Sequence, residues 1–306
     1  MLRLIGRRAA TSIVPFLFVV IGVFALSRMT GNPASLYLPL TATPEMRATF
    51  SAAHGFDQPI WKQFLDYVQD VAHGDFGTSL WTGRPAMSMV LDTFPNTLIL
   101  AVITIMIAVV LSVTLGSWAA YRPNSILDKA VSALSVIAAS VPDFWFALMS
   151  ILVFAVTLNW LPTSGMGGAA TYVLPVLALL INPVGVLAQV TRGEMVTALS
   201  APYVKVARSK GAGEGRIVAR HVLRNALAPT VTVAGTMAVY LINGAVVVET
   251  VFGWPGIGNL TINALQQRDF ATIQAAVFVI ALAIFILNIL IDVLYAAMDP
   301  RVRPAK

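Results

Sequence analysis

The sequence contains no cysteine, and charged residues make up only 11% of its 306 positions. The lack of cysteine excludes disulfides, thiolate metal sites and cysteine nucleophiles. An average soluble domain has about 25% charged residues, and this chain has fewer than half as many. Together with 58% hydrophobic residues and a mean hydropathy of +0.80, the shortage of charge indicates an integral membrane protein.

Sequence patterns for catalysis are also missing. There is no G-x-x-x-x-G-K-[ST] nucleotide-binding motif, and His54, His73 and His221 are not arranged as H-E-x-x-H. The glycine-rich run at 211–215 follows a predicted basic helix rather than a strand, which argues against a phosphate-binding loop. No Ser/His/Asp or Ser/Lys set can be assembled by spacing. We therefore expect a chain that is not an enzyme and that holds no cofactor or metal itself.

Six apolar runs are long enough for spanning helices, which need about 20 residues each. These runs are residues 9–26, 97–120, 130–156, 172–190, 229–248 and 273–297. The first run starts like a signal peptide, but it lacks a clear small-residue cleavage site before Arg28, so we expect it to be retained. The resulting organisation is an N-terminal span in 1–29, an extracytoplasmic segment in 30–94, and a five-helix core in 95–306 containing a cytoplasmic loop, 191–228.

The distribution of positive charge predicts the orientation, because Lys and Arg are enriched in cytoplasmic loops. About 15 of the 20 Lys and Arg residues fall on the side that holds both termini and the loop 191–228. We therefore expect a multi-pass protein of a bacterial inner membrane with both termini in the cytoplasm. This placement explains the pI near 9.8, so we expect contact with membrane lipid and none with nucleic acid.

The extracytoplasmic segment carries an apolar stripe between turn signals. The stripe recurs at helical spacing and comprises Ile60, Trp61, Phe64, Leu65, Val68 and Val71. It predicts a short helix. This helix would lie on the membrane surface or on neighbouring spans, or would form the wall of an external vestibule or a docking surface, and these interpretations are compatible.

Proline and polar residues interrupt three of the predicted spans. Proline removes a backbone donor, and in lipid the freed carbonyl must be satisfied by a neighbouring helix or by water. A carboxylate at the bilayer centre costs at least about 2.5 to 3.5 kcal/mol, so Asp143 leaves open a proton-coupled secondary transporter or channel. Packing kinks are the structural alternative. The pathway or gate candidates are Ser140, Pro142, Asp143, Asn182, Pro183 and Asn243, the last beside Gly244.

The loop 200–229 is the long polar segment of the C-terminal two thirds of the chain. We expect Ser200 to cap a helix whose first turn holds Pro202, and Gly211 to end it after about three turns. One face of this helix would carry Tyr203, Val206, Ala207 and Lys210, and its small residues would suit insertion into a cleft on another protein.

A second helix is expected from Gly215 to Ala226. It places Arg216, Arg220 and Arg224 four residues apart, which gives a basic stripe on one side. The stripe fits attraction to anionic headgroups, worth about 1 kcal/mol per basic residue, as well as it fits docking to a protein.

The loop resembles the cytoplasmic coupling loop of permease subunits of ATP-binding cassette importers. The resemblance rests on Tyr203-Val204-x-x-Ala207-Arg208-x-Lys210-Gly211 and on the run from His221 to Pro229. Only Ala207 and Gly211 match the general signature of Glu-Ala-Ala followed by Gly, because Lys205 and Val206 occupy its first two places. The sequence is most similar to the dipeptide, oligopeptide and nickel branch.

Other stretches resemble the same branch over nearly the whole chain. They include Phe56-Asp57-Gln58-Pro59, Gly74-Asp75-Phe76-Gly77-Thr78-Ser79 and the run from Glu249 to Gly258, Glu-Thr-Val-Phe-Gly-Trp-Pro-Gly-Ile-Gly. The long external segment after the first span resembles the dipeptide-type B permease.

The resemblance implies an all-α membrane protein with six transmembrane helices, a cytoplasmic coupling helix and the MetI-like fold. It implies half of a translocation pathway for di- or oligopeptides, paired with a second homologous permease. Two cytoplasmic ATPase subunits would bind ATP and Mg, and an extracytoplasmic solute-binding protein would deliver the solute. The solute itself stays open between dipeptides, oligopeptides, nickel complexes and related compounds. A membrane-embedded enzyme or assembly subunit is disfavoured by the missing catalytic set.

The same resemblance implies two groups of contact residues. The ATPase-coupling residues are Pro202, Tyr203, Val206, Ala207, Arg208, Lys210 and Gly211. The candidates for the mouth that meets the binding protein are Phe252, Trp254, Pro255 and Gly256.

Overall fold

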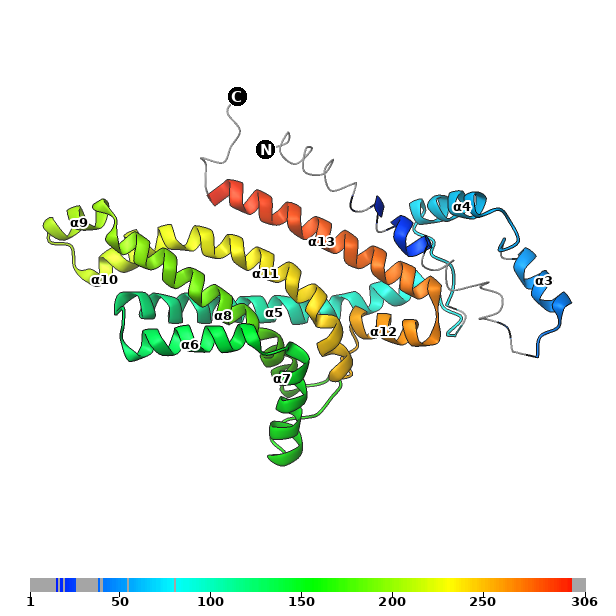
Figure 1. Cartoon of the computed structure of the whole chain (residues 1–306), viewed down its shortest axis with the longest axis horizontal. Helices are drawn as coiled ribbons and strands as arrows, with labels where there is room; N and C mark the ends of the chain where they lie inside the picture. The colour runs from blue at the N-terminus through cyan, green and yellow to red at the C-terminus, as the bar shows by residue number, and fades with distance from the viewer. Residues whose placement is uncertain are drawn as a thin grey trace, which may run out of the picture. The chain divides into compact units, whose positions relative to one another are not determined.

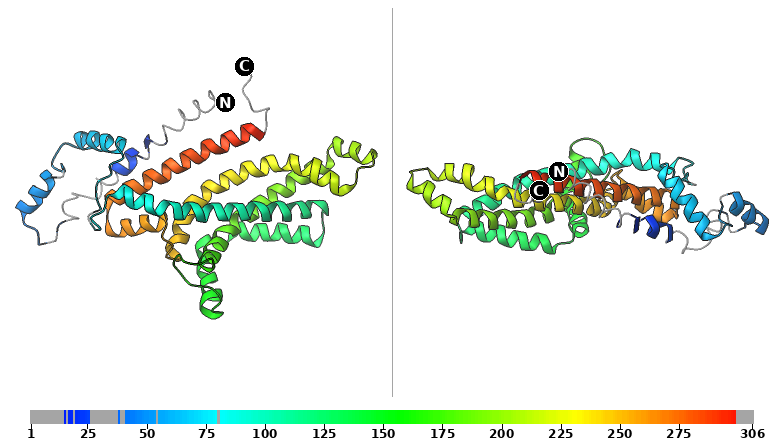
Figure 2. Two further views of the ribbon diagram at one scale, coloured as in Figure 1. Left: turned by 180° about the vertical axis from the view of Figure 1, so that it is seen from behind. Right: turned by 90° about the horizontal axis from the view of Figure 1, so that it is seen from above.

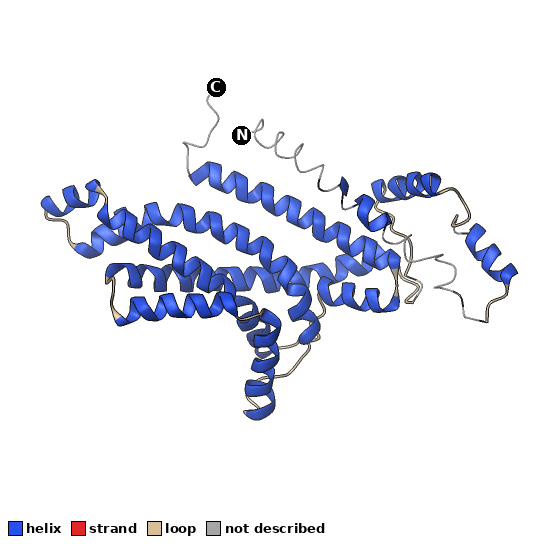
Figure 3. Ribbon diagram, viewed as in Figure 1, coloured by secondary structure: helices blue, strands red, loops and turns tan. Residues whose placement is uncertain are grey.

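The computed structural model describes residues 15, 17, 18, 20–25, 38, 41–53, 55–79 and 81–298. In this part of the chain the regular structure is helical and no strand is present (Figure 3). An isolated bridge joins Thr78 and Pro85. The predicted all-α class is confirmed, whereas half of the predicted first span, 9–26, lies outside the described residues.

The helices follow one another along the chain (Figure 1). In chain order they are α3 (Pro44–Ala53), α4 (Ile60–Ala72), α5 (Ala86–Tyr121), α6 (Ile126–Ser140), α7 (Asp143–Ser150), the π-helical segment η1 (Ile151–Thr157), α8 (Ala170–Ser200), α9 (Pro202–Ser209), α10 (Glu214–Ile217), the π-helical segment η2 (Val218–Val222), α11 (Leu223–Val251), α12 (Ile257–Gln267) and α13 (Phe270–Met298).

Four stretches of helix among the described residues are long and apolar enough to cross a membrane. They are Ala86–Tyr121, Ala170–Ser200, Glu214–Val251 and Phe270–Tyr295. Helix α6 and the stretch Asp143–Thr157 form a fifth candidate if the pair counts as one span, although it is bent by 100°. Each of these overlaps a predicted span. Helix α5 begins at Ala86, inside the segment expected to be extracytoplasmic.

The described residues form two compact units. Unit 1 contains Thr97–Pro255 and residues 286–298, and unit 2 contains the residues up to Asn96 together with Gly256–Phe285. Helices α5 and α13 each contain residues of both units.

Helix α8 is the central element of unit 1, where it packs against α11, α6 and α7. Helix α7 runs across the direction of α6 (Figures 1 and 2). Two glycines permit close approach between helices. A Cβ at Gly185 of α8 would lie 2.9 Å from the Ala138 Cβ of α6, and a Cβ at Gly116 of α5 would lie 2.8 Å from the carbonyl oxygen of Ala188. Small residues at such crossings allow membrane helices to pack closely.

Unit 2 has its own apolar core. Phe76, Ala86 and Val90 pack with residues of α12 and α13, and the Phe76 and Phe278 rings lie 5.0 Å apart. The Trp81 indole donates to the carbonyl oxygen of Gln267 at 2.8 Å. These contacts fix the turn before α5 against the C-terminal helices of the same unit.

The predicted turns and helix of the external segment are confirmed. Gly55, Gly74, Gly77 and Gly83 all have positive φ, between 67° and 79°. Helix α4 spans the predicted apolar stripe, and its Phe64 ring packs edge-on against Phe24 at 5.2 Å.

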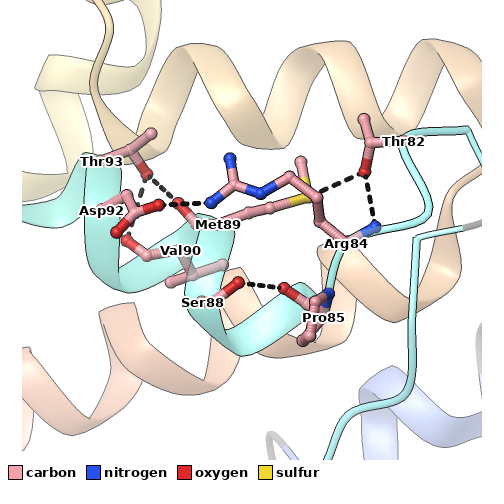
Figure 4. Close-up of polar contacts among 8 residues, drawn as sticks. All are labelled: Thr82, Arg84, Pro85, Ser88, Met89, Val90, Asp92 and Thr93. Atoms are coloured by element: carbon pink, nitrogen blue, oxygen red, sulfur yellow. Dashed lines mark hydrogen bonds and ion pairs between the residues drawn. The ribbon is translucent and has the colours of Figure 1, made fainter.

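The first turns of α5 are closed by polar contacts (Figure 4). Arg84 pairs with Asp92 at 2.6 Å, the Thr82 hydroxyl donates to the Met89 sulfur, and the Ser88 hydroxyl donates to the carbonyl oxygen of Pro85. Both partners of the Arg84–Asp92 pair are exposed, so the pair orders the turn at little gain in stability.

Candidate functional site

The short helix expected in the polar loop is α9, and its start differs from the prediction. Ser200 belongs to the end of α8, where its hydroxyl donates to the carbonyl oxygens of Val196 and Thr197 at 3.2 and 2.8 Å. The N-cap is Ala201, in extended conformation, with Pro202 at the first helical position. The expected cap by Ser200 is therefore wrong, because a helical serine satisfies its hydroxyl on its own preceding turn.

The predicted end of α9 at Gly211 is confirmed. Gly211 has φ +78°, its N–H donates to Arg208 at 2.9 Å, and the Ala212 N–H donates to Ala207 at 3.1 Å. This pair of bonds is the Schellman arrangement, which needs a left-handed residue after the helix. The helix has 8 residues, which is about two turns and not the expected three.

Val204 anchors α9 and was missed in the sequence. It is fully buried in a cluster with Met195 of α8, Ile217 of α10 and Ala226 of α11. Ala207 packs partly against the same cluster, so it faces inward more than predicted. Tyr203 and Val206 are 40% and 52% exposed, and Pro202, Arg208 and Lys210 are exposed as well.

An ion pair closes the hairpin between α9 and α10. The Arg208 Nε and Nη2 atoms donate to the two oxygens of Glu214 at 2.7 and 3.1 Å. The Arg208 guanidinium therefore already has a carboxylate partner within its own chain. Together with the buried Val204, this bidentate pair holds the hairpin together. The hairpin lies at the ends of α8 and α11 (Figures 1 and 2).

The second helix of the loop is longer than expected. In place of a separate helix from Gly215 to Ala226, α10, η2 and α11 form one continuous stretch from Glu214 to Val251. Arg216, Arg220 and Arg224 are all exposed, as the predicted basic stripe requires.

The predicted break in the third span is confirmed at Pro142. Helix α6 ends at Ser140, and Pro142 is the N-cap of α7, which begins with Asp143. The half-buried Asp143 carboxylate accepts a hydrogen bond from the Tyr240 hydroxyl of α11 at 2.8 Å. A Cβ at Gly244 would lie 3.6 Å from the same carboxylate oxygen. Tyr240 was missed, although a phenol within an apolar span needs a polar partner.

The other two expected interruptions are wrong. Helix α8 continues through Asn182 and the buried Pro183, and α11 continues through Asn243. The Ser140 hydroxyl and the Asn243 amide donate to carbonyl oxygens one turn earlier in their own helices. Of the pathway candidates, the structure brings Asp143 to α11, the helix that carries Asn243.

The aromatic residues proposed for the mouth point into the core of unit 1. Phe252 and Trp254 are fully buried, and Trp254 packs edge-on against Tyr172 at 4.7 Å. The Gly165 N–H donates to the Phe252 carbonyl at 2.9 Å. Gly253 has φ +56°, and Gly256 is buried as the N-cap of α12. Pro255 and Gly253 remain at the surface.

A buried carboxylate stands next to this corner. Glu249 is fully buried, and one of its oxygens accepts from the Thr97 hydroxyl at 2.5 Å. The backbone carbonyl of Glu249 accepts from the Trp254 N–H at 2.8 Å. Glu249 therefore ties the end of α11 to α5, a role that its place in the sequence motif did not indicate.

Comparison with known proteins gives a consistent result. Residues 112–304 match the model of the binding-protein-dependent transport system inner membrane component, and residues 1–101 match the N-terminal model of such membrane components.

Relatives match over nearly their whole length. The oligopeptide transport system permease protein AppB of Bacillus subtilis is 34% identical over 97% of this chain and 98% of its own. The glutathione transport system permease protein GsiC of Salmonella choleraesuis is 36% identical over 99% of both chains. A probable peptide ABC transporter permease of Sinorhizobium fredii is 35% identical over 97% of this chain and 98% of its own.

A solved structure shares the fold. An inward-facing MetNI methionine ABC transporter matches with a TM-score of 0.58 at 17% identity, over 70% of this chain and 97% of the solved chain. The match supports the predicted MetI-like fold.

Proposed function

Because this chain belongs to the family of inner membrane components of binding-protein-dependent transport systems, we propose that it forms half of the translocation pathway of an ATP-driven peptide importer. The chain is a non-catalytic, multi-pass membrane subunit, so energy and solute selection come from other chains. The observation that carries the proposal is identity of 34% to 36% over nearly the full length of permeases.

The proposed solute is a di- or oligopeptide. The relatives are named for oligopeptides, peptides and glutathione, and glutathione is itself a tripeptide. The shared chemistry is a short chain of amide bonds with charged ends. A bound peptide would be delivered by an extracytoplasmic binding protein, as the family description implies.

The proposed partners on the cytoplasmic side are two ATPase subunits that hold ATP and Mg. Exposed Val206 of α9 would make the contact, while Val204 and the Arg208–Glu214 pair hold α9 to its own chain. A push on α9 would therefore reach α8 and α11 directly, because α9 lies between them in sequence and packs on both in one cluster. Such rigid coupling suits a switch between inward and outward access.

The proposed pathway runs along the broken span. Asp143 and Tyr240 place a carboxylate and a phenol at the 100° bend between α6 and α7. Six spans, with residues 9–26 as the first and with both termini cytoplasmic, complete the proposed topology. A second homologous permease would supply the opposite wall.

The proposed mouth is the corner at Gly253 and Pro255. The buried Phe252 and Trp254 side chains hold this corner against the core of unit 1. Contact with the binding protein would therefore be made by the exposed Gly253 backbone and Pro255, and not by the aromatic rings.

Reconstitution tests this function. In liposomes that contain the chain with its second permease and ATPases, uptake of a labelled dipeptide or tripeptide should require both ATP and the binding protein. Uptake by the chain alone, driven by a proton gradient, would support the alternative of a secondary transporter that uses Asp143. Failure of the chain to co-purify with any ATPase would also contradict the proposal.

A further inference from the structure

A polar cavity lies at the base of the α9–α10 hairpin. It has a volume of about 500 Å³ and is lined by Tyr203 of α9, Arg220 of η2, and Arg224 and Asn225 of α11. All four side chains carry hydrogen-bond donors. The volume falls in the range of small-molecule pockets, about 300 to 1,000 Å³.

The cavity carries unneutralised positive charge. Neither Arg220 nor Arg224 takes part in the ion pairs Arg84–Asp92, Arg192–Asp128 and Arg208–Glu214 of the described residues. Each guanidinium presents five N–H donors in a planar fork that matches phosphate oxygens.

The hydrogen-bonded pair of Asn225 and Tyr203 adds a hydroxyl donor to the cavity. The Asn225 Nδ2 atom donates to the Tyr203 hydroxyl oxygen at 3.1 Å. Because the oxygen of Tyr203 serves as the acceptor in this bond, its proton is left to donate to another group. The lining is thus rich in donors, which suits an anion with several acceptor oxygens more than it suits a cation or an apolar group.

The position of the cavity along α11 favours a phospholipid as the source of the anion. Arg224 precedes Pro229, the start of the apolar run of α11, by five residues, which is about 7.5 Å along a helix. The headgroup layer on each side of a bilayer is about 5 to 7 Å thick. Arg224 therefore lies just outside the headgroup layer, from where its long side chain can reach back to the phospholipid phosphates, and Arg220 lies one turn, about 6 Å, farther into the cytoplasm.

We propose that this cavity binds the phosphate of an anionic phospholipid in the adjoining leaflet. Arg220 and Arg224 hold the phosphate oxygens, and the Tyr203 hydroxyl donates to the same headgroup. Because Tyr203 belongs to α9 and the arginines to η2 and α11, the lipid bridges the coupling hairpin to the membrane span. The hairpin thereby becomes sensitive to the lipid composition of its membrane.

Native mass spectrometry of the purified transporter containing this chain tests the site, with dioleoyl phosphatidylglycerol and dioleoyl phosphatidylcholine as probes. The double variant Arg220→Gln/Arg224→Gln should weaken phosphatidylglycerol binding at least about tenfold, since each basic residue contributes about 1 kcal/mol near an anionic surface. Tyr203→Phe should weaken it by about threefold. Phosphatidylcholine binding should change little.

The matched control removes two charges from the same hairpin outside the cavity. Lys205→Gln/Arg216→Gln should change phosphatidylglycerol binding by less than about twofold, because both residues are exposed and neither lines the cavity. An equal loss in the control would mean diffuse attraction and would overturn the site.

Two further outcomes would overturn the proposal. If inorganic phosphate binds with the same dependence on Arg220 and Arg224 and phosphatidylglycerol does not, the cavity takes a soluble anion. If the double variant keeps its lipid but loses its co-purifying ATPase, the arginines contact a protein. Unchanged circular dichroism and thermal unfolding of the double variant would confirm that it remains folded.

Discussion

Asp128 at the start of α6 and Arg192 near the end of α8 form a bidentate ion pair that joins two neighbouring helices. Arg192 donates from Nη2 to one carboxylate oxygen at 2.9 Å and from Nε to the other. Asp128 also accepts the Asn124 N–H at 2.8 Å, which holds the turn before α6, where Asn124 has φ 65°. The Asp128 side chain is 4% exposed and that of Arg192 is 31% exposed.

Removing one partner of this pair should destabilise the protein. Asp128→Ala leaves the guanidinium and the Asn124 N–H without their acceptor. Breaking a fully buried pair costs about 3 to 5 kcal/mol, and the partial exposure of Arg192 reduces the expected loss to about 2 kcal/mol. Thermal unfolding in detergent measures it. The control is Asp92→Ala, which breaks the exposed pair with Arg84 and should cost less than about 1 kcal/mol. Equal losses would contradict the structural role of Asp128.

Gly185 should not tolerate a side chain, whereas Gly193 in the same helix should. A Cβ at Gly185 would lie 2.9 Å from the Ala138 Cβ and 3.1 Å from the Ser135 carbonyl oxygen, while one at Gly193 would have nothing within 4 Å. Gly185→Ala should lower the free energy of unfolding by about 1 to 3 kcal/mol through overpacking. Gly193→Ala should raise it by about 0.5 to 1 kcal/mol through helix propensity. A neutral Gly185→Ala would show that α6 and α8 pack less closely than described.

The sequence predicted those features that depend on local chemistry. Pro142 lies at a break because it has no N–H to donate to the last turn of α6 and it fits the start of α7, and Gly211 ends α9 because few other residues adopt positive φ. The lengths of the apolar runs correctly predicted the membrane-spanning helices that lie among the described residues. The break at Asn182–Pro183 failed because loss of one backbone bond is tolerated when a helix packs on three others, as α8 does.

Features that depend on distant contacts could not be predicted. Val204 and Val206 are equally apolar, and only the position of Ile217 and Ala226 decides that Val204 is buried. Trp254 looked like a surface aromatic in a turn, yet Tyr172, far away in sequence, receives it in the core. The Asp143–Tyr240 bond likewise joins residues on separate spans.

Single cysteines should report the topology and the coupling contact, because the chain has no cysteine of its own. Val206→Cys should react with an impermeant maleimide from the cytoplasmic side and should cross-link to an ATPase subunit, since Val206 is 52% exposed on α9. The control Ile60→Cys, on exposed α4, should react from the opposite side and form no such cross-link. Labelling of both from one side would contradict the proposed topology.

Asp143 should modulate uptake without being essential for it. Asp143→Asn removes the charge but keeps an oxygen that accepts from Tyr240, so the bend between α6 and α7 should persist. Loss of a partly exposed charge interaction with a peptide ammonium, about 1 kcal/mol, should lower ATP-driven dipeptide uptake about fivefold. Tyr240→Phe, which keeps the carboxylate, should lower it about twofold.

Uptake of labelled dipeptide into liposomes, with and without a proton ionophore, checks these values for Asp143. Thr114→Val is the control, because the Thr114 hydroxyl bonds only within α5, to the carbonyls of Val110 and Leu111, and its loss should leave uptake unchanged. In an ATP-driven importer the ionophore has no effect on any variant, because ATP supplies the energy. Abolished uptake in Asp143→Asn, together with inhibition of the unmodified protein by the ionophore, would instead identify Asp143 as a proton carrier.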